Sequence, residues 1–295
     1  MAIPPAWTGV WIAESVQAHL QARGRDAARR RQYRYHDQFR AAREREKHDR
    51  VVAFGARLPT LRKQVQRDLE RGGLPAARVL AGLVRLLDTT LARIGNARYV
   101  AENGSHGLTT LRKRHAELHD TATLSFSGKS GRDWEMEVEE PRVLAVIGKC
   151  LETRGKKLFK YREDGEARAV NSDDVNAYLA DAVGAPITAK DFRVWGGTVR
   201  AAVELARAPD RFPEQAPASR VVRAMEATAE VLGNTPAVCR ASYVHPAILE
   251  ALPGTEDAPL RKPLLERRFR ARPPRKSLSA VERVVLDYLK SELVG

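Results

Sequence analysis

Arginine and aromatic side chains are interleaved near the start of the chain, in a pattern suited to contact with nucleic acid. Residues 19–50 contain eleven lysines and arginines, and Tyr33, Tyr35, His36 and Phe39 lie among them. Guanidinium groups pair with phosphate oxygens, and aromatic rings pack on sugars or bases. Aromatic and polar side chains alternate in QYRYH (residues 32–36), as they do in a strand. The alternative interpretation is a solvated basic helix. The pattern favours a nucleic-acid surface.

Other motifs that could carry chemistry are incomplete. The sequence GKS at 128–130 resembles the end of a phosphate-binding loop, but the glycine this loop needs five residues earlier is Thr123. His115 and His119 have the spacing of a metal-binding pair, but HAELH lacks the HExxH glutamate and a third ligand. Neither GxSxG nor GxGxxG occurs, so the sequence does not support a hydrolase or a dinucleotide-binding enzyme.

The most informative stretch is VLGNTPAVCRASYVHP, residues 231–246. Gly233 is predicted to end a helix, a tight restart follows at Asn234, and Tyr243 comes nine residues after Asn234. This stretch resembles the nucleophile region of type IB DNA topoisomerases, in the bacterial branch that is similar to the poxvirus enzyme. Other segments match the family in its order: IPPAW with GRDAARRRQYRYH, LARIGNARY, FSGKSG and TAKDFRVWGGT. The resemblance runs from about residue 3 to residue 250.

The resemblance implies how a DNA strand would be cut. Tyr243 corresponds to the family's nucleophile, which attacks phosphorus, forms a 3′-phosphotyrosyl link and expels the 5′-hydroxyl. Arg93 and Arg193 correspond to two catalytic arginines, and Asn234 to a histidine or asparagine. These three side chains would bind the non-bridging oxygens as negative charge grows on them.

The leaving 5′-oxygen needs a proton. Lys129 corresponds to the family's hairpin lysine and is the expected general acid, with assistance from Lys190. Cationic side chains would then do the work that Mg²⁺ does in other enzymes. Reversal of the same step reseals the strand, so the resemblance implies no metal, no ATP and no other cofactor.

Each of these residues also has a purely structural interpretation. Arg93 could be a cation at a helix C-terminus, Lys129 and Arg193 ordinary surface charges, Asn234 a turn residue and Tyr243 a core aromatic. Any one of them alone is better explained in this way. Their occurrence together, in the family's order, favours the catalytic interpretation.

Two other classes of protein compete with a topoisomerase. Tyrosine recombinases have a similar catalytic domain, but they normally carry His-x-x-Arg at the second arginine, and this chain has Lys190-x-x-Arg193. The chain also lacks signs of their four-helix N-terminal domain. A non-catalytic DNA-binding module would have no need of Tyr243 and its partners. Both alternatives are therefore less favoured.

The N-terminal segment resembles the family's DNA clamp, which implies contact with double-stranded DNA. The residues expected to make this contact are Arg31, Gln32, Tyr33, Arg34 and Tyr35. We expect a clamp domain at 1–48 and a catalytic domain at 49–295. Relatives usually carry a few dozen residues before IPPAW, so we expect either a truncated clamp or a start codon placed too far downstream. Two further departures are Val194, in place of threonine, and Gly196, where bacterial relatives often carry alanine.

The elements that must hold these residues are mainly helices. Apolar residues at three- and four-residue spacing predict helices at 75–94, from Pro141 to near Gly155, from a cap at Ser172 to Gly184, after a cap at Thr188, from Ser219 to Gly233, and near the C-terminus around 281–289. Alternating residues on both sides of the turn GKSG (128–131) predict a β-hairpin with Lys129 at its tip. A charged stretch at 43–50 precedes the helices, and the basic, proline-broken run 261–276 is expected to be a surface linker.

This arrangement predicts an α+β protein. A small β-containing N-terminal domain would precede a mainly α-helical catalytic domain with a small antiparallel sheet, like that of tyrosine recombinases and type IB topoisomerases. There is no internal repeat and no βαβ alternation.

Composition agrees with an anionic partner. The 295 residues include 51 Lys+Arg and 37 Asp+Glu, a net charge of +14, which favours nucleic acid over a membrane surface. No apolar run is long enough to span a membrane, and the N-terminus lacks the order of a signal peptide. Two cysteines, Cys150 and Cys239, exclude a disulfide scaffold and a Cys-rich zinc site. We expect a cytoplasmic monomer clamped on the DNA of the nucleoid.

Overall fold

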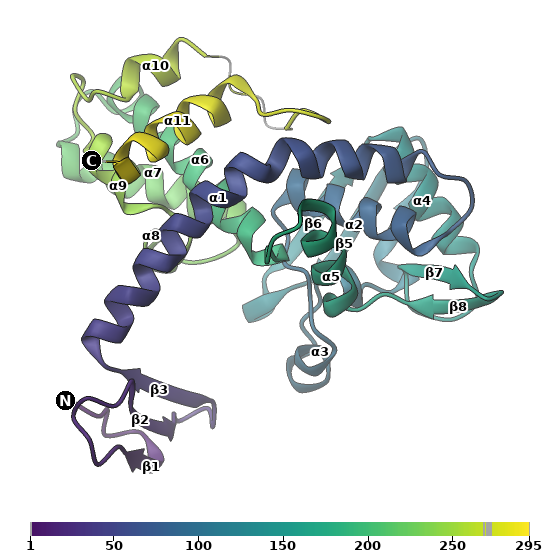
Figure 1. Cartoon of the computed structure of the whole chain (residues 1–295), viewed down its shortest axis with the longest axis horizontal. Helices are drawn as coiled ribbons and strands as arrows, with labels where there is room; N and C mark the ends of the chain where they lie inside the picture. Colours follow the sequence, from purple (N-terminus) through teal and green to yellow (C-terminus); the bar gives the residue numbers. More distant parts are fainter. Residues whose placement is uncertain (1, 268, 270–272, 295) are drawn as a thin grey trace. The chain divides into compact units, whose positions relative to one another are not determined.

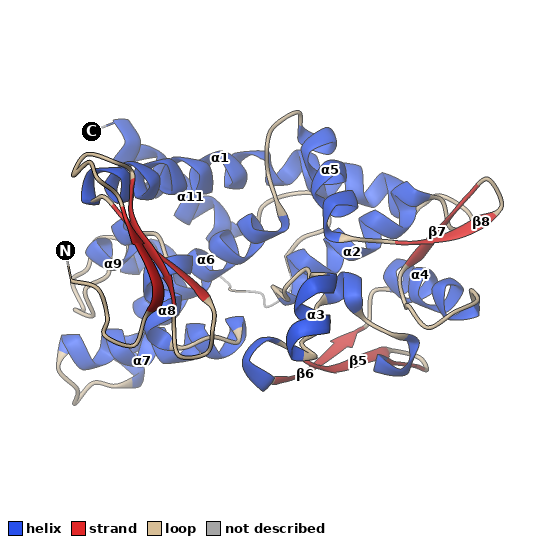
Figure 2. Cartoon of the chain, turned by 90° about the horizontal axis from the view of Figure 1, so that it is seen from below, coloured by secondary structure: helices blue, strands red, loops and turns tan. Residues whose placement is uncertain are grey.

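Two units of unequal size, residues 1–50 and 51–295, make up the chain in the computed structural model (Figure 1). The structure describes residues 2–267, 269 and 273–294, apart from the side chains of 41–48, 99, 130 and 294. In this part of the chain every strand pair is antiparallel and helices outnumber strands (Figure 2), which confirms the predicted α+β class. None of the described helices is both long and apolar enough to cross a membrane.

The first unit is built on a three-stranded sheet. Its order is β1 (Thr8–Ile12), β2 (Leu20–Arg25) and β3 (Arg31–Tyr35), so the strand predicted from QYRYH is confirmed. Ala22 and Gly24 are its buried positions on β2. A Cβ atom on Gly24 would lie 2.8 Å from Cε3 of Trp7, so the indole packs directly on the strand backbone.

The second unit contains most of the helices. Helix α1 (Asp37–Leu69) begins in the first unit and ends in the second. The α-helices that follow are α2 (Ala76–Thr90), α3 (Ala97–Asn103), α4 (Pro141–Glu152), α5 (Ser172–Val183), α6 (Ala189–Arg211), α7 (Pro217–Leu232), α8 (Pro236–Tyr243), α9 (Pro246–Ala251), α10 (Arg261–Leu265) and α11 (Ala280–Val294). One sheet has the order β4 (Ala116–Leu118), β5 (Ala122–Ser127) and β6 (Asp133–Val138), and β7 (Lys160–Glu163) pairs with β8 (Glu166–Ala169). Short 3₁₀ helices are η1 (Leu108–Thr110), η2 (Lys113–His115) and η3 (Lys129–Gly131).

Helix α6 organises the core of the second unit. It contacts α2, α5, α7, α8, α9, α10 and α11. Most of its residues are buried, which requires close approach by its neighbours. On α1, a Cβ atom at Gly55 would lie 2.5 Å from Cζ3 of Trp195, so the large indole of α6 fits against a position that has no side chain.

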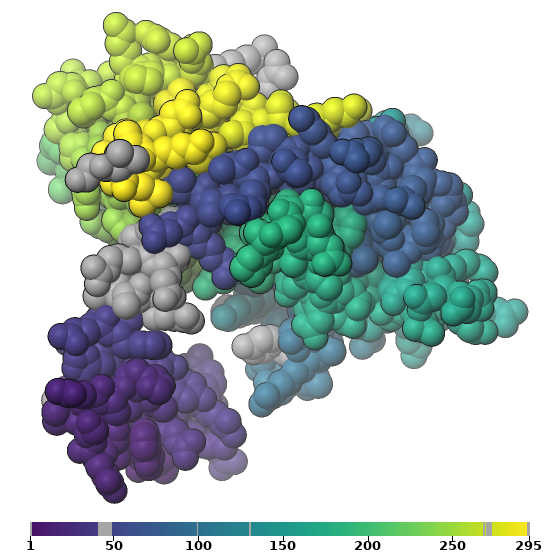
Figure 3. Space-filling view, in the orientation of Figure 1, coloured from purple at the N-terminus to yellow at the C-terminus, as the bar shows by residue number. Residues whose placement is uncertain are grey.

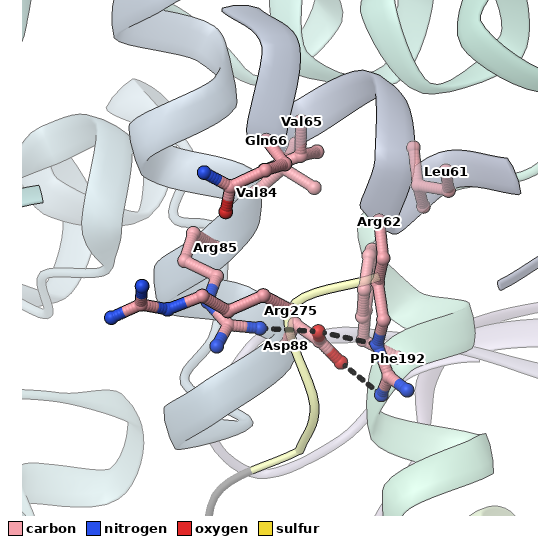
Figure 4. A pocket seen from close by; sticks show the side chains of 9 residues that line it. All are labelled: Leu61, Arg62, Val65, Gln66, Val84, Arg85, Asp88, Phe192 and Arg275. Atoms are coloured by element: carbon pink, nitrogen blue, oxygen red, sulfur yellow. Dashed lines mark hydrogen bonds and ion pairs between the residues drawn. The ribbon is translucent and has the colours of Figure 1, made fainter. Parts of the chain in front are cut away.

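A buried network of charges joins four helices around Arg62. The Arg62 guanidinium, whose residue is 3% exposed, donates two hydrogen bonds of 2.9 Å to the carboxylate of Asp88 on α2. It also donates to both carboxylate oxygens of Glu282 on α11, at 3.0 and 2.8 Å. Trp195 Nε1 of α6 donates to Glu282 Oε1 at 3.2 Å. Arg85 donates to the same Asp88 carboxylate, and Figure 4 shows both arginines directed toward it.

This network ties the C-terminal helix to the beginning of the second unit. In Figure 3 the yellow α11 lies against the blue α1, and Arg62 and Glu282 join the two across 220 residues of sequence. Burial alone would raise the pKa of Glu282, but the hydrogen bonds and charge of Arg62 hold that pKa below its usual value. Glu282 is therefore ionised in the folded protein.

One predicted helix is longer than the helix observed. The spacing predicted a helix over 75–94, but α2 ends at Thr90 and Leu91 adopts a left-handed φ of 54°. Arg93 and Ile94 lie in a loop, where their carbonyls accept hydrogen bonds from the backbone N–H groups of η1 at 3.0 and 2.8 Å. Ile94 fits the apolar periodicity of the helix although it lies outside it, because its side chain packs against the core from this loop.

Other boundaries also differ from the predictions. Asn171, not Ser172, caps α5, since its side chain accepts the N–H groups of two following residues. Helix α7 starts two residues before Ser219, and α4 ends before Gly155. The charged stretch 43–50 is part of α1, and the predicted linker at 261–276 begins with α10, whose Leu264 is buried in the core. The hairpin around Lys129, the helix capped by Thr188, the helix ends at Gly184 and Gly233 and the C-terminal helix are confirmed.

Replacing Arg62 by alanine should strongly destabilise the protein. The substitution leaves the carboxylates of Asp88 and Glu282 buried without their shared partner, and breaking a buried pair in this way costs about 3–5 kcal/mol. Urea and thermal unfolding would measure the loss. The matched control is Arg98→Ala, which removes an arginine whose ion pair with Glu102 is largely exposed and which should change stability little. Equal effects of the two substitutions would contradict a structural role for the Arg62 network.

Candidate active site

Arg193 and Tyr243, two predicted catalytic residues, lie side by side in the second unit. Arg193 is on α6 and is 3% exposed, and Tyr243 is the last residue of α8. The guanidinium carbon of Arg193 lies 4.9 Å from the centre of the Tyr243 ring. A Cβ atom on Gly197 would lie 2.8 Å from the carbonyl oxygen of Tyr243, so this glycine lets α8 end against α6.

Two helix ends hold the guanidinium of Arg193. Its Nη2 donates to the carbonyl of Leu232 at 2.7 Å, and its Nη1 donates to the carbonyl of Leu91. These carbonyls belong to the ends of α7 and α2, where carbonyl groups lack partners within the helix. The Nε of Arg193 is buried and has no hydrogen-bond partner among the described residues. Burial, and then the charge of Arg93, lower the pKa of Arg193 to about 10, so it remains charged at neutral pH.

Arg93 contacts the turn between α7 and α8 that carries Asn234. Arg93 Nη1 donates to the carbonyl of Gly233 at 3.2 Å, and Asn234 is the next residue. Both polar atoms of the Asn234 side chain are buried without a hydrogen-bond partner in the described part of the chain. A buried amide in this state costs about 1–3 kcal/mol.

Positive charge acts on the Tyr243 hydroxyl. Burial alone would raise the pKa of Tyr243, but the charge and hydrogen bond of Arg193, followed by the charges of Arg93 and Lys190, lower it below that of free tyrosine. Lys190 lies in the first turn of α6 and is exposed. The arrangement therefore favours loss of the phenolic proton.

Lys129 lies at the tip of the β5–β6 hairpin. Its side chain is exposed and makes no hydrogen bond or ion pair with the described residues. The hairpin itself is anchored, because Arg132 Nη2 donates to the carbonyl of Glu230 at 2.8 Å near the end of α7. Trp134 of β6 packs on the next turn, where a Cβ atom on Gly233 would lie 2.4 Å from Cζ2 of the indole. The hairpin is thus attached to the turn that carries Asn234.

The sequence patterns did not reveal the residues that brace this site. Thr198, which is fully buried on α6, donates its hydroxyl to the carbonyl of Tyr243 at 3.3 Å and accepts the N–H of His245 at 3.1 Å. Trp134 and Arg132 fix the hairpin, and Leu91 supplies a carbonyl through its left-handed backbone. Thr198 belongs to the segment TAKDFRVWGGT, so only the family resemblance could have pointed to it.

The residues predicted to contact DNA lie on β3 of the first unit: Arg31, Gln32, Tyr33, Arg34 and Tyr35. All are exposed except Gln32, which is half-buried and whose amide donates to Asp26 Oδ2 at 2.9 Å. The rings of Tyr33 and Tyr35 lie 6.2 Å apart, centre to centre. Arg25 and Arg23 of β2 pair with Arg31 and Tyr33, so these cations share one face of the sheet.

Family models match both units. Residues 36–258 match the catalytic core of eukaryotic DNA topoisomerase I, and residues 1–26 match the N-terminal domain of bacterial DNA topoisomerase IB. The chain belongs to the type IB DNA topoisomerase family. The six predicted catalytic residues lie within the longer match, whereas Arg31 to Tyr35 lie between the two matches.

Several viral and fungal topoisomerases are similar to this type IB topoisomerase. DNA topoisomerase 1B of Acanthamoeba polyphaga mimivirus is 32% identical over 257 residues, which cover 84% of this chain and 76% of the viral protein. DNA topoisomerase 1B of vaccinia virus is 24% identical over 262 residues, covering 84% of this chain and 78% of that protein. DNA topoisomerase 1 of Mycosarcoma maydis is 26% identical over 184 residues, 55% of this chain and 18% of the fungal protein. These matches confirm the resemblance found in the sequence.

Replacing Gly233 by alanine should damage the topoisomerase more than the same change at Gly184. Both glycines end a helix in the left-handed conformation, with φ of 61° and 63°, so both changes impose a backbone cost of about 1–2 kcal/mol. Only at Gly233 would the new Cβ also collide with Trp134, which adds about 1–3 kcal/mol and displaces the hairpin.

Thermal unfolding and the rate of DNA cleavage would be measured for both variants. Gly184→Ala should lose stability while it keeps its cleavage rate, since nothing lies within 4 Å of the added carbon. Gly233→Ala should lose both. Matching losses in the two variants would rule out an anchoring role for the contact between Gly233 and Trp134.

Proposed function

We propose that this enzyme cuts one strand of duplex DNA with Tyr243 and relaxes supercoils of either sign. The tyrosine oxygen attacks phosphorus, the bond to the 5′-oxygen breaks, and the 3′ end stays on the enzyme as a phosphotyrosyl ester. The free end swivels, and the 5′-hydroxyl then attacks the ester and restores the strand. The bond energy is kept in the ester, so the cycle needs no ATP.

The observation that carries this proposal is the grouping of Arg193, Arg93 and Asn234 around Tyr243. The Arg193 guanidinium lies over the tyrosine ring, and Arg93 bonds to the residue next to Asn234. Buried polar atoms of Arg193 and Asn234 have no hydrogen-bond partner among the described residues. A phosphodiester supplies the oxygen atoms that these donors lack.

The charges of the site suit a reaction without a metal ion. Arg93 and Arg193 would bind the non-bridging oxygens with donors that remain charged throughout, and Asn234 would add a neutral donor. Such a contact is typically worth about 2.7–4 kcal/mol in the transition state. The positive side chains would therefore supply the stabilisation for which other phosphoryl-transfer enzymes recruit Mg²⁺.

In the cleavage step Tyr243 gives up its phenolic proton to water, and the departing 5′-oxygen gains a proton. The depressed pKa of Tyr243 supports its role as the nucleophile. The departing 5′-oxygen would take a proton from Lys129, whose side chain has no competing partner in the described structure, with Lys190 assisting. In religation the same proton returns to Lys129.

We further propose that the first unit is a DNA clamp. Its exposed face with Arg23, Arg25, Arg31 and Tyr33 supports contact with phosphates and sugars along a duplex. The domains would divide as expected at residue 48, and one copy of the chain would act alone on the DNA of the nucleoid in the cytoplasm. The second unit would have the fold shared by tyrosine recombinases and type IB topoisomerases.

The purified chain should relax supercoiled plasmid in EDTA without ATP and produce a ladder of topoisomers. Tyr243→Phe should bind DNA but form no covalent adduct, because the attacking oxygen is missing. Tyr161→Phe is the matched control, since Tyr161 lies on β7 outside the site and should relax DNA normally. Gel assays of relaxation and of the denatured protein–DNA adduct would give both readouts. An adduct formed by Tyr243→Phe would disprove the nucleophile, and relaxation that requires a divalent metal would disprove the metal-free reaction.

Replacing Asn234 by alanine should lower activity without loss of stability. Single-turnover cleavage should fall about 10²–10³-fold, as when an oxyanion donor is removed. Stability should stay the same or rise, because the substitution removes a buried amide that has no partner among the described residues. Rapid-quench cleavage and urea unfolding would test the two statements. A variant that is less stable but fully active would show that Asn234 serves the fold and not the reaction.

A further inference from the structure

The proposed cleavage reaction uses none of the basic residues at 112–114 and 154–157. Arg112, Lys113, Arg114, Gly155 and Lys156 line an open hollow of about 400 Å³, here called the basic groove. The two segments are about forty residues apart in the sequence, and neither carries an acidic residue. The fold therefore gathers positive charge at this place.

Backbone hydrogen bonds force the two segments together. Arg112 and Lys157 form an antiparallel bridge, and the N–H of Lys113 donates to the carbonyl of Lys156 at 3.0 Å. The N–H of Leu158 donates to the carbonyl of Leu111 at 2.9 Å. Side-chain repulsion cannot separate cations that the main chain pairs in this way, so the basic groove is built into the fold.

Two of the lysines at the groove have structural partners. Lys113 Nζ donates to the carbonyls of Leu151 and Thr153 at the end of α4, where a cation is favourable. Lys160, which is 5% exposed, donates to the carbonyl of Arg154. These ammonium groups brace the groove but bring no negative charge to it, since their partners are all neutral.

The other cations of the groove have no carboxylate partner. Among the described residues, no ion pair involves Arg112, Arg114, Arg154, Lys156 or Lys157. Arg114 makes a hydrogen bond of 3.5 Å to its neighbour His115. Elsewhere in the second unit, arginines such as Arg85, Arg211 and Arg261 are paired with acids. The groove is thus an uncompensated cluster in a chain that commonly neutralises its arginines.

The pKa values of two groups beside the basic groove are lowered, as expected where positive charge is concentrated. Burial, followed by the charges of His106, Arg114 and Arg112, lowers the pKa of His115 to about 4. Burial and the charge of Lys113 also lower the pKa of Lys160. The neighbouring positive charges repel one another, and an anion bound in the groove would offset that repulsion.

The lining suits a chain of phosphates. It offers forked guanidinium donors and ammonium groups, but no aromatic ring on which a base could stack. Such a surface binds a phosphodiester backbone without reading its sequence. Because the proposed substrate is duplex DNA, the DNA backbone is the polyanion available to it, and this step rests on the proposed function.

We propose that the basic groove is an accessory site for phosphates of a DNA backbone, distinct from the site around Tyr243. The phosphates come either from the duplex that is being cut or from a second duplex held at the same time. In both cases the groove adds affinity that depends on salt and not on base sequence.

The test is equilibrium DNA binding by the full chain with Arg114→Ala and Lys156→Ala combined. Both side chains are exposed, so the fold should persist, and a thermal midpoint equal to that of the wild type would verify this. Each lost phosphate contact reduces the slope of log affinity against log salt by about 0.9, so the double variant should lose about 1.8 for a duplex whose phosphates occupy the groove. The matched control, Lys262→Ala with Lys290→Ala, removes two exposed lysines of α10 and α11 and should keep the wild-type slope.

Two substrates distinguish the source of the phosphates. If the cut duplex reaches the groove, the double variant shows the reduced slope on a short duplex bound one to one. If a second duplex occupies the groove, the double variant keeps the wild-type salt slope for one-to-one binding of the short duplex. The variant then loses two properties of the wild type: binding of a second duplex, and preference for supercoiled over relaxed plasmid. Lys156→Gln alone should lose about half of either effect, which guards against misfolding of the double variant.

Unchanged slopes together with unchanged plasmid preference would overturn the proposal, and so would an equal loss in the lysine control. The yield of covalent adduct by the wild type is measured in parallel. Absence of adduct with normal DNA binding contradicts the proposed function, whereas normal adduct with unaltered salt slopes and unaltered plasmid preference contradicts the accessory site alone.

Discussion

The candidate active site contains a buried guanidinium, that of Arg193, which has no carboxylate partner among the described residues. Arg193 is held by two helix-end carbonyls and by the ring of Tyr243, all of which are neutral groups. Arg62 is equally buried, but Asp88 and Glu282 neutralise it. The two buried arginines thus differ in the charge of their partners, which are neutral for Arg193 and negative for Arg62. The neutralised Arg62 joins helices, whereas the role proposed for Arg193 is to offer its charge to an anion that arrives from outside.

These two arginines are coupled through helix α6. Trp195 lies two residues after Arg193 and donates to Glu282, so the helix that carries the site arginine is bonded to the Arg62 network. Gly55 and Gly197 allow α1 and α8 to approach α6 closely on either side of this segment. The position of Arg193 is thus fixed by contacts with distant parts of the chain.

Local signals explain what could be predicted from the sequence. The hairpin of Lys129 and the restart before Tyr243 are marked by glycine, proline and alternation, which act over a few residues. The end of α2 was predicted wrongly because Ile94 continues the apolar period from a loop, and that loop is held by η1. The pairing of Arg62 with Glu282 spans 220 residues, so no periodic pattern could have revealed it. Six catalytic candidates came from family order, and the proximity of Arg193, Arg93 and Tyr243 came only from the fold.

The departure at Gly196 has a local reason in the same fold. A Cβ atom there would lie 2.4 Å from Cδ2 of Leu91, so the alanine that bacterial relatives often carry would need this side chain to move. Leu91 has a left-handed backbone, and its carbonyl accepts a hydrogen bond from Arg193. The absence of a side chain at Gly196 therefore leaves room for the Leu91 side chain, in the residue whose carbonyl contacts Arg193. The departure concerns how that arginine is supported and leaves its proposed chemistry unchanged.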